Sequence, residues 1–191
     1  AAEGDLDAVI RLLQRGAGVN ARDAMGYTPL MGAAVNGHWH VAKWLLDKGA
    51  DANAANRDGM TALMGAAYAG NVRVVRLLLE KGADVNAREP FAGMSALMMA
   101  ADHNQPEVVQ VLLMNGADVH GRTTSGKTAL MLALGGNHLE TAKLLMTGGA
   151  DPNVKEENGA PVLLGAASSG RLDVVRLLLE GGADVNARTA K

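Results

Sequence analysis

The sequence predicts an all-α solenoid in which helix–turn–helix units are joined by β-hairpin-like loops. The pair Gly-Ala recurs at steps of 33 or 34 residues, beginning at Gly16, Gly49, Gly82, Gly116, Gly149 and Gly182. A fixed period of this length indicates one supersecondary unit that is repeated along the chain. Each period also holds two apolar segments with helical spacing. Because stacked repeats share one continuous core, we expect residues 1–191 to form a single domain.

The period divides this domain into a partial N-terminal repeat, five full repeats and a tail. The expected boundaries are 1–22, then 23–55, 56–88, 89–122, 123–155 and 156–188, and finally 189–191. The third full repeat carries one extra residue in its turn, which accounts for the single step of 34. The last repeat is as apolar as the interior ones, although the ends of a solenoid need a polar outer face. We therefore expect a segment of a longer protein, self-association end to end through the uncapped termini, or a last repeat that tolerates exposure.

The second full repeat, 56–88, shows what each unit is expected to form. After a polar turn, the Thr61 hydroxyl can cap the first free amides of a short helix over 62–69. Gly70 ends that helix, because Gly adopts the left-handed conformation without strain. A second helix over 72–81 follows. Its expected buried face consists of Val74, Val75, Leu78 and Leu79.

The other repeats keep these signals with one exception. Hydroxyl caps are also expected at Thr28, Ser95 and Thr128. The first helices are expected to end at Gly37, Asn104, Asn137 and Gly170, since Gly and Asn both tolerate a left-handed backbone. Pro161 occupies the capping position of the last repeat and has no hydroxyl, so that helix lacks the usual start signal.

The motif that opens each first helix resembles that of a known family. It is TPLMGAA from Thr28, TALMGAA from Thr61, SALMMAA from Ser95 and TALMLAL from Thr128. The five full repeats close with GADANA, GADVNAR, GADVHGR, GADPNVK and GADVNAR. Over essentially its whole length the chain resembles ankyrin repeats, which have a T-P-L-H-x-A signature. In that family the signature His hydrogen-bonds neighbouring turns. Here it is replaced by Met31, Met64, Met98, Met131 and Leu164, and we expect the Met side chains to pack instead.

Composition and charge argue against several classes of function. The formal net charge of −2, from 18 basic and 20 acidic residues, does not favour binding to nucleic acid or anionic lipid. The chain has no cysteine, which excludes disulfides and thiolate zinc sites. Its longest apolar stretches are too short to span a bilayer, so we expect no membrane insertion. The compartment stays open, with the cytoplasm as the default for a soluble chain without a signal peptide at its start.

One segment matches a catalytic motif by coincidence. Residues 121–128, GRTTSGKT, fit the phosphate-loop pattern G-x-x-x-x-G-K-[ST]. The repeat register already explains Gly126 and Thr128, which coincide with the turn glycine and helix cap of the other repeats. Only His38 and His40 among the five histidines are near neighbours, and two imidazoles without a carboxylate make a poor metal site. We therefore expect no enzyme activity, no cofactor and no metal.

Two further features are expected to be structural. Trp39 and Trp44 lie five residues apart on the second helix of the first full repeat, where core packing is the simplest role. Asn86, in the sequence DVNA, resembles the targets of an asparagine hydroxylase in animals. We expect it to be a hydrogen-bonding turn residue.

The resemblance also implies where a partner would bind. In ankyrin repeats, turn tips and first helices line a concave groove that binds proteins. On this chain the exposed apolar positions of that groove fall in the first three full repeats. The candidate partner-binding residues are Met25, Tyr27, Val35, Asn36, Arg57, Asp58, Met60, Tyr68, Phe91, Met94, Asp102 and His103. We expect a protein or peptide partner, with Tyr68 near the centre of its site.

The sequence thus favours a protein-interaction module without catalysis. The alternative is a regulatory ankyrin segment of a larger multidomain enzyme or channel, which a longer reading frame would support. Neither the identity of the partner nor a natural as opposed to an engineered origin follows from the residues.

Overall fold

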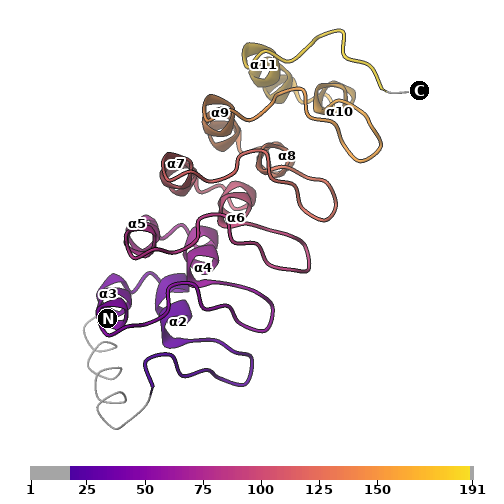
Figure 1. The fold of residues 1–191 in the computed structure, drawn as a ribbon. Coiled ribbons are helices and arrows are strands. Elements are labelled where there is room, and N and C mark those ends of the chain that lie inside the picture. The colour runs from indigo at the N-terminus through magenta and orange to yellow at the C-terminus, as the bar shows by residue number, and fades with distance from the viewer. Residues whose placement is uncertain (1–17, 190–191) are drawn as a thin grey trace.

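A computed structural model describes residues 18–189 of the chain. Most of the partial repeat expected at 1–22 and most of the expected tail lie outside these residues. The described part consists of five helix pairs stacked into an elongated solenoid (Figure 1). The predicted all-α solenoid is therefore confirmed.

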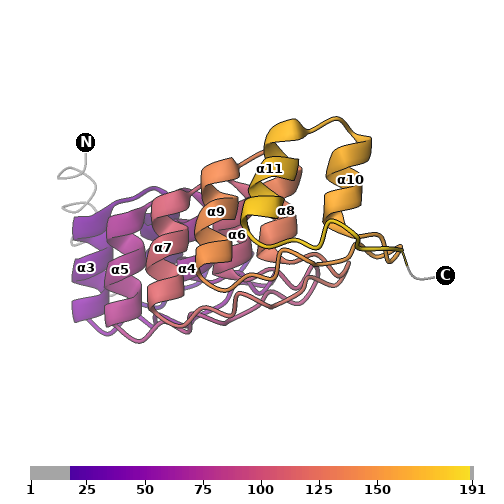
Figure 2. The same cartoon turned by 90° about the horizontal axis from the view of Figure 1, so that it is seen from above.

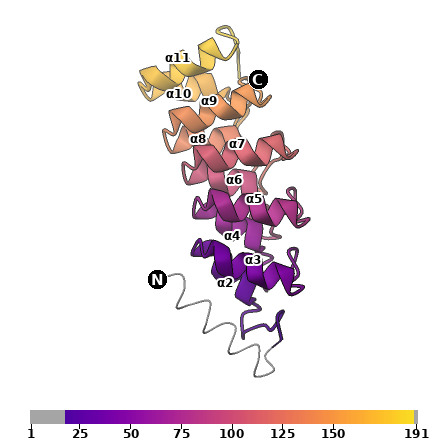
Figure 3. The same cartoon turned by 90° about the vertical axis from the view of Figure 1, so that its left-hand side faces the viewer.

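Each full repeat forms a first helix of seven residues and a second helix of nine. The first helices are α2 (Pro29–Val35), α4 (Ala62–Tyr68), α6 (Ala96–Asp102), α8 (Ala129–Gly135) and α10 (Val162–Ser168). The second helices are α3 (Trp39–Asp47), α5 (Val72–Glu80), α7 (Pro106–Met114), α9 (Leu139–Thr147) and α11 (Leu172–Glu180). The second helices form one layer, and the hairpin loops all project from the same side of the solenoid (Figures 1 and 3).

The helix starts follow the predicted capping pattern. The hydroxyls of Thr28, Thr61, Ser95 and Thr128 each accept the backbone N–H three residues on, at 3.3 Å. These bonds satisfy amides that have no partner inside the helix. Helix α10 begins after Pro161 without a side-chain cap, as expected. The left-handed stops are also confirmed at Asn104 and Asn137, whose φ angles are 52° and 60°.

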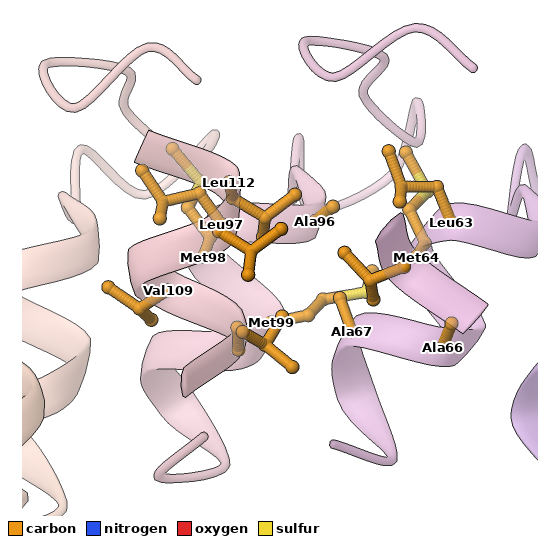
Figure 4. Packing of buried hydrophobic residues seen from close by; sticks show 14 of the residues in the cluster. Leu63, Met64, Ala66, Ala67, Ala96, Leu97, Met98, Met99, Val109 and Leu112 are labelled. Carbon is orange, nitrogen blue, oxygen red and sulfur yellow. The ribbon is translucent and has the colours of Figure 1, made fainter. Parts of the chain in front are cut away.

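The methionines at the signature position have two roles. Met64 and Met98 are each only 1% exposed and pack in the core between successive repeats, as predicted (Figure 4). The sequence did not predict a second role for two others. The sulfur atoms of Met31 and Met131 accept the N–H of Thr28 and Thr128 at 3.4 Å, which completes a reciprocal cap. These bonds stay within one repeat and do not join neighbouring turns.

Two series of hydrogen bonds join neighbouring repeats. In the loops, the Asn86 side chain donates to the Gly116 carbonyl and accepts the Asp118 N–H, and equivalent bonds are made by Asn20 and Asn53. The prediction that Asn86 is a hydrogen-bonding turn residue is confirmed. At the helices, the residue before α5, α7, α9 and α11 bonds to one or two carbonyls at the end of the first helix in the preceding repeat. These residues are Asn71, Gln105, His138 and Arg171.

The core continues from repeat to repeat through the first helices. Helix α2 packs on α4, α4 on α6 and α6 on α8. Although α8 and α10 both lie within the described residues, no comparable packing joins them. Helix α10 stands apart from the row of first helices in the view from above (Figure 2). None of the helices in residues 18–189 is long and apolar enough to cross a membrane.

Candidate functional site

The hairpin tips and the ends of the first helices of the first three full repeats carry exposed apolar side chains. We call this the upstream surface. Its large exposed side chains are Met25, Tyr27, Val35, Tyr68 and Phe91, with exposures between 41% and 69%. Met60 and Met94 are half-buried and pack against the core. The predicted polar residues Asn36, Arg57, Asp58, Asp102 and His103 are also exposed.

The hairpin tips that carry these side chains are held by one residue at the start of each turn. Asp23 accepts the N–H groups of Met25 and Tyr27 at 2.9 and 2.8 Å. Asn56 accepts those of Asp58 and Met60, both at 2.9 Å. Because these amides are fixed, the side chains at the tips project from a defined backbone.

Glu89 holds the longer turn of the third repeat in the same way. Its carboxylate accepts the N–H groups of Phe91, Ala92 and Met94 at 2.7 to 3.1 Å. Burial alone would raise the pKa of Glu89, but hydrogen bonds from Met94, Ala92, Phe91 and Gly93 outweigh it, and the pKa lies below its ordinary value of 4.5. The ionised carboxylate thereby positions Phe91, the most exposed apolar side chain of the upstream surface.

Tyr68 and His103 form an aromatic pair at the centre of the upstream surface. Their ring centroids lie 4.0 Å apart at an interplanar angle of 48°. The His103 Nδ1 atom lies 3.1 Å from the Met99 carbonyl oxygen, which selects the tautomer that carries a proton on Nδ1. Gln105 donates to the Tyr68 carbonyl at 3.3 Å. The pair places two aromatic rings at the exposed ends of neighbouring first helices.

The phosphate-loop match at residues 121–128 has its amides engaged within the repeat. The N–H of Gly126 donates to the Thr123 carbonyl, and that of Lys127 donates to the Thr123 hydroxyl. The N–H of Thr128 donates to the Met131 sulfur, while its hydroxyl caps α8. A phosphate site of this type needs free backbone amides, so this loop has the motif without the chemistry.

The described residues also contain no group of three or more metal-ligating side chains that could hold an ion. The tryptophan prediction is confirmed, because Trp39 and Trp44 are half-buried and pack against the core. Cations lie over both indoles: Arg73 is 4.8 Å from the Trp39 ring and Lys48 is 5.7 Å from the Trp44 ring.

Next to the tryptophans, Asp47 accepts hydrogen bonds from Lys43 at 2.5 Å and Lys81 at 2.7 Å. These two bonds lower the pKa of Asp47 to about 2. The Lys81 bond crosses from α3 to the end of α5, so this exposed ion pair joins the first two full repeats.

The described residues also form a cleft that the sequence did not predict. A cleft of about 880 Å³ lies between α8 and α10, on the fourth and fifth full repeats. Its lining includes Lys127, Met131, Leu134, Glu156, Val162 and Arg171. The sequence carried one signal for it: Gly135 stands where the earlier repeats have Val35, Tyr68 and Asp102, and it faces a second glycine, Gly165.

Comparison with known families gives a match over nearly the whole chain. A family model described as ankyrin repeats, in three copies, matches residues 1–89 and 92–189. No curated protein gives a significant match.

Proposed function

Since the chain belongs to the ankyrin repeat family, we propose that it is an interaction module that binds a protein or peptide partner on its upstream surface. Ankyrin repeats are generally protein–protein interaction modules. The module acts without catalysis of its own. The lowered pKa values of Asp47 and Glu89 come from hydrogen bonds that hold the fold together.

The observation that carries this proposal is the clustering of exposed apolar side chains. Tyr27 and Met25 lie on the first hairpin tip, Val35 and Tyr68 lie at the ends of α2 and α4, and Phe91 lies on the third tip. Val35 and Tyr68 occupy equivalent positions of successive repeats and so fall in one row along the solenoid. Contiguous exposed apolar groups favour a protein-binding surface, and Tyr is often a hot-spot residue.

The chemistry of the upstream surface defines the partner only broadly. Aromatic and thioether groups at Tyr27, Met60 and Tyr68 favour apolar side chains of the partner. Arg57, Asp58 and Asp102 lie around them as exposed charges of both signs. A polar rim around an apolar centre is typical of protein interfaces.

The test is affinity capture with the purified chain, followed by measurement of the captured partner's affinity for variants. Tyr68→Ala and Met60→Ala should each weaken binding by more than about 1 kcal/mol, or roughly fivefold, if they are hot spots. Met114→Ala is the control, since Met114 is an exposed side chain on α7 outside the upstream surface. The proposal fails if Tyr68→Ala and Met60→Ala leave the affinity unchanged.

A further inference from the structure

The cleft between α8 and α10 arises from a pair of glycines at one helix–helix contact. In the first junction, Val35 of α2 meets Gly65 of α4, and a Cβ atom built on Gly65 would lie 3.6 Å from the Val35 Cβ. The equivalent pairs are Tyr68 with Met99, and Asp102 with Leu132. At the last junction the pair is Gly135 with Gly165.

With no side chain on either glycine, nothing fills the space between the two helices. A Cβ atom on Gly135 would have no neighbour within 4 Å, and one on Gly165 would meet only the Glu156 side chain. Leu164, at the signature position, is 45% exposed, whereas Met64 and Met98 are each 1% exposed. The last junction is therefore open at the point where the others are closed.

The walls of the cleft are apolar and its lips are charged. Val162, Ala166 and Val174 line it together with Leu134 and Met131. Lys127 lies at the lip formed by the fourth hairpin, and Glu156 and Glu157 lie at the lip formed by the fifth. Within residues 18–189, no ion pair joins Lys127 to either glutamate. Arg171 lies deeper and is bound to the Leu134 carbonyl and the Asn137 side chain.

We propose that this cleft is a second binding site, which takes an apolar side chain of a polypeptide next to a basic residue. The apolar side chain enters between α8 and α10. The basic residue pairs with Glu156 and Glu157, the two adjacent carboxylates on the fifth hairpin. Lys127 repels a basic residue at the lip formed by the fourth hairpin. The bound segment therefore places its basic residue toward the fifth hairpin.

A polypeptide fits this site because the cleft is continuous with the upstream surface. Ser125, Lys127 and Gly135 occupy the same repeat positions as Met25, Tyr27 and Val35. The volume of about 880 Å³ is within the range of roughly 300–1,000 Å³ typical of ligand sites. This inference rests on the proposed function, since both sites bind a polypeptide on one side of the solenoid.

The probe is a short, capped, fluorescent peptide with two central leucines flanked by arginines. One matched peptide has glutamates in place of the arginines, and another has serines in place of the leucines. Fluorescence polarisation should show binding of the arginine peptide above both matched peptides. Methyl NMR signals of Leu134, Val162 and Val174 should shift on its addition, because these groups line the cleft.

Variants separate the cleft from the rest of the molecule. Gly135→Trp fills the cleft and should weaken binding of the arginine peptide by more than about tenfold. Gly32→Trp is the control on α2, since among residues 18–189 no atom outside α2 lies within 4 Å of a Cβ built on Gly32. Glu156→Lys combined with Glu157→Lys should reverse the preference between the arginine and glutamate peptides. Ser168→Trp, from the exposed end of α10, is the second filling variant if Gly135→Trp does not fold.

Three results would overturn the inference. They are equal binding of the three peptides, unchanged binding to both filling variants, or retained preference for arginine after the double glutamate exchange. Tyr68→Ala should not alter binding of the arginine peptide. If Tyr68→Ala abolishes partner capture while Gly135→Trp leaves peptide binding unchanged, the proposed function stands and the cleft proposal fails. If the arginine peptide binds in the cleft but Tyr68→Ala leaves partner capture intact, the cleft proposal stands and the proposed function of the upstream surface is wrong.

Discussion

The junction between the first two full repeats and the junction between the last two use the same positions with different results. At the first, Asn53 bonds to the next loop, Arg57 bonds to the Met25 carbonyl through its backbone, and α2 packs on α4. At the last, Asn153 accepts the N–H of Asp184, but α8 and α10 are separated by a cleft. One repeat pattern therefore supports both a closed and an open junction.

Side-chain volume at the contact between first helices helps to decide whether two repeats close. The last repeat keeps the turn glycine and the second helix, but Pro161 replaces the capping hydroxyl and Leu164 replaces the signature Met. At the contact itself, the pair is Val35 with Gly65 at one end and Gly135 with Gly165 at the other. The turn residue changes its role as well, because Glu89 binds its own hairpin whereas Glu156 extends over Gly165.

The two regions should differ most in how much a substitution at the signature position lowers the free energy of unfolding. Met64→Ala should destabilise the protein by about 2–5 kcal/mol, because it removes a fully buried side chain from a packed core. Leu164→Ala should cost less than about 0.5 kcal/mol, since Leu164 lies at the open junction. Urea unfolding followed by circular dichroism measures both. Equal losses would show that the last repeat is packed like the others.

The next largest difference in stability is expected between Glu89 and Glu156, which stand at the start of their hairpins. Glu89→Ala should destabilise by about 1–3 kcal/mol at neutral pH, because three hairpin amides lose their acceptor. Glu156→Ala should be nearly neutral. Since the pKa of Glu89 is lowered on folding, its stabilisation is present above about pH 4.5 and is lost as the pH falls through the folded pKa.

Unfolding titrations of wild type and Glu89→Gln across this range measure that pH dependence. The gap in stability between the two proteins should shrink below pH 4.5. A gap that stays constant down to low pH would mean that the ionised carboxylate is not what holds the hairpin.

The smallest expected difference concerns the hydrogen bonds between loops. Asn86→Ala should cost about 1–2 kcal/mol, since it breaks bonds to Gly116 and Asp118 in the next repeat. His120 holds the equivalent position one repeat later, and in the part of the chain described its side chain forms no such bond to Gly149 or Asp151. His120→Ala should therefore change stability by less than about 0.5 kcal/mol, and His120→Asn should raise it. Thermal melting of the three variants tests this, and a large loss in His120→Ala would contradict it.

Most of the fold could be predicted because its signals are local. The caps at Thr61 and Ser95 and the stops at Gly70 and Asn104 act within a few residues. The sequence also predicted which large side chains of the upstream surface are exposed. Its role in binding remains a proposal, since exposure alone does not identify a partner.

The open junction could not be predicted from any single repeat. It depends on Gly135 and Gly165, which are 30 residues apart and matter only because they face the same contact. Gly65 occupies the same position as Gly165, but no cleft forms there because Val35 fills the space beside it. The sulfur bonds of Met31 and Met131 were missed for a related reason: they depend on the side-chain conformation and not on the residue type.

The most direct test of the open junction is a pair of spin-label distances measured by electron paramagnetic resonance. Because the chain has no cysteine, labels can be placed specifically in Val35→Cys with Tyr68→Cys, and in Gly135→Cys with Ser168→Cys. Both pairs join the ends of successive first helices at equivalent positions. We predict a clearly longer distance for the second pair than for the first. Equal distances would contradict the account, because the last junction would then be closed like the others.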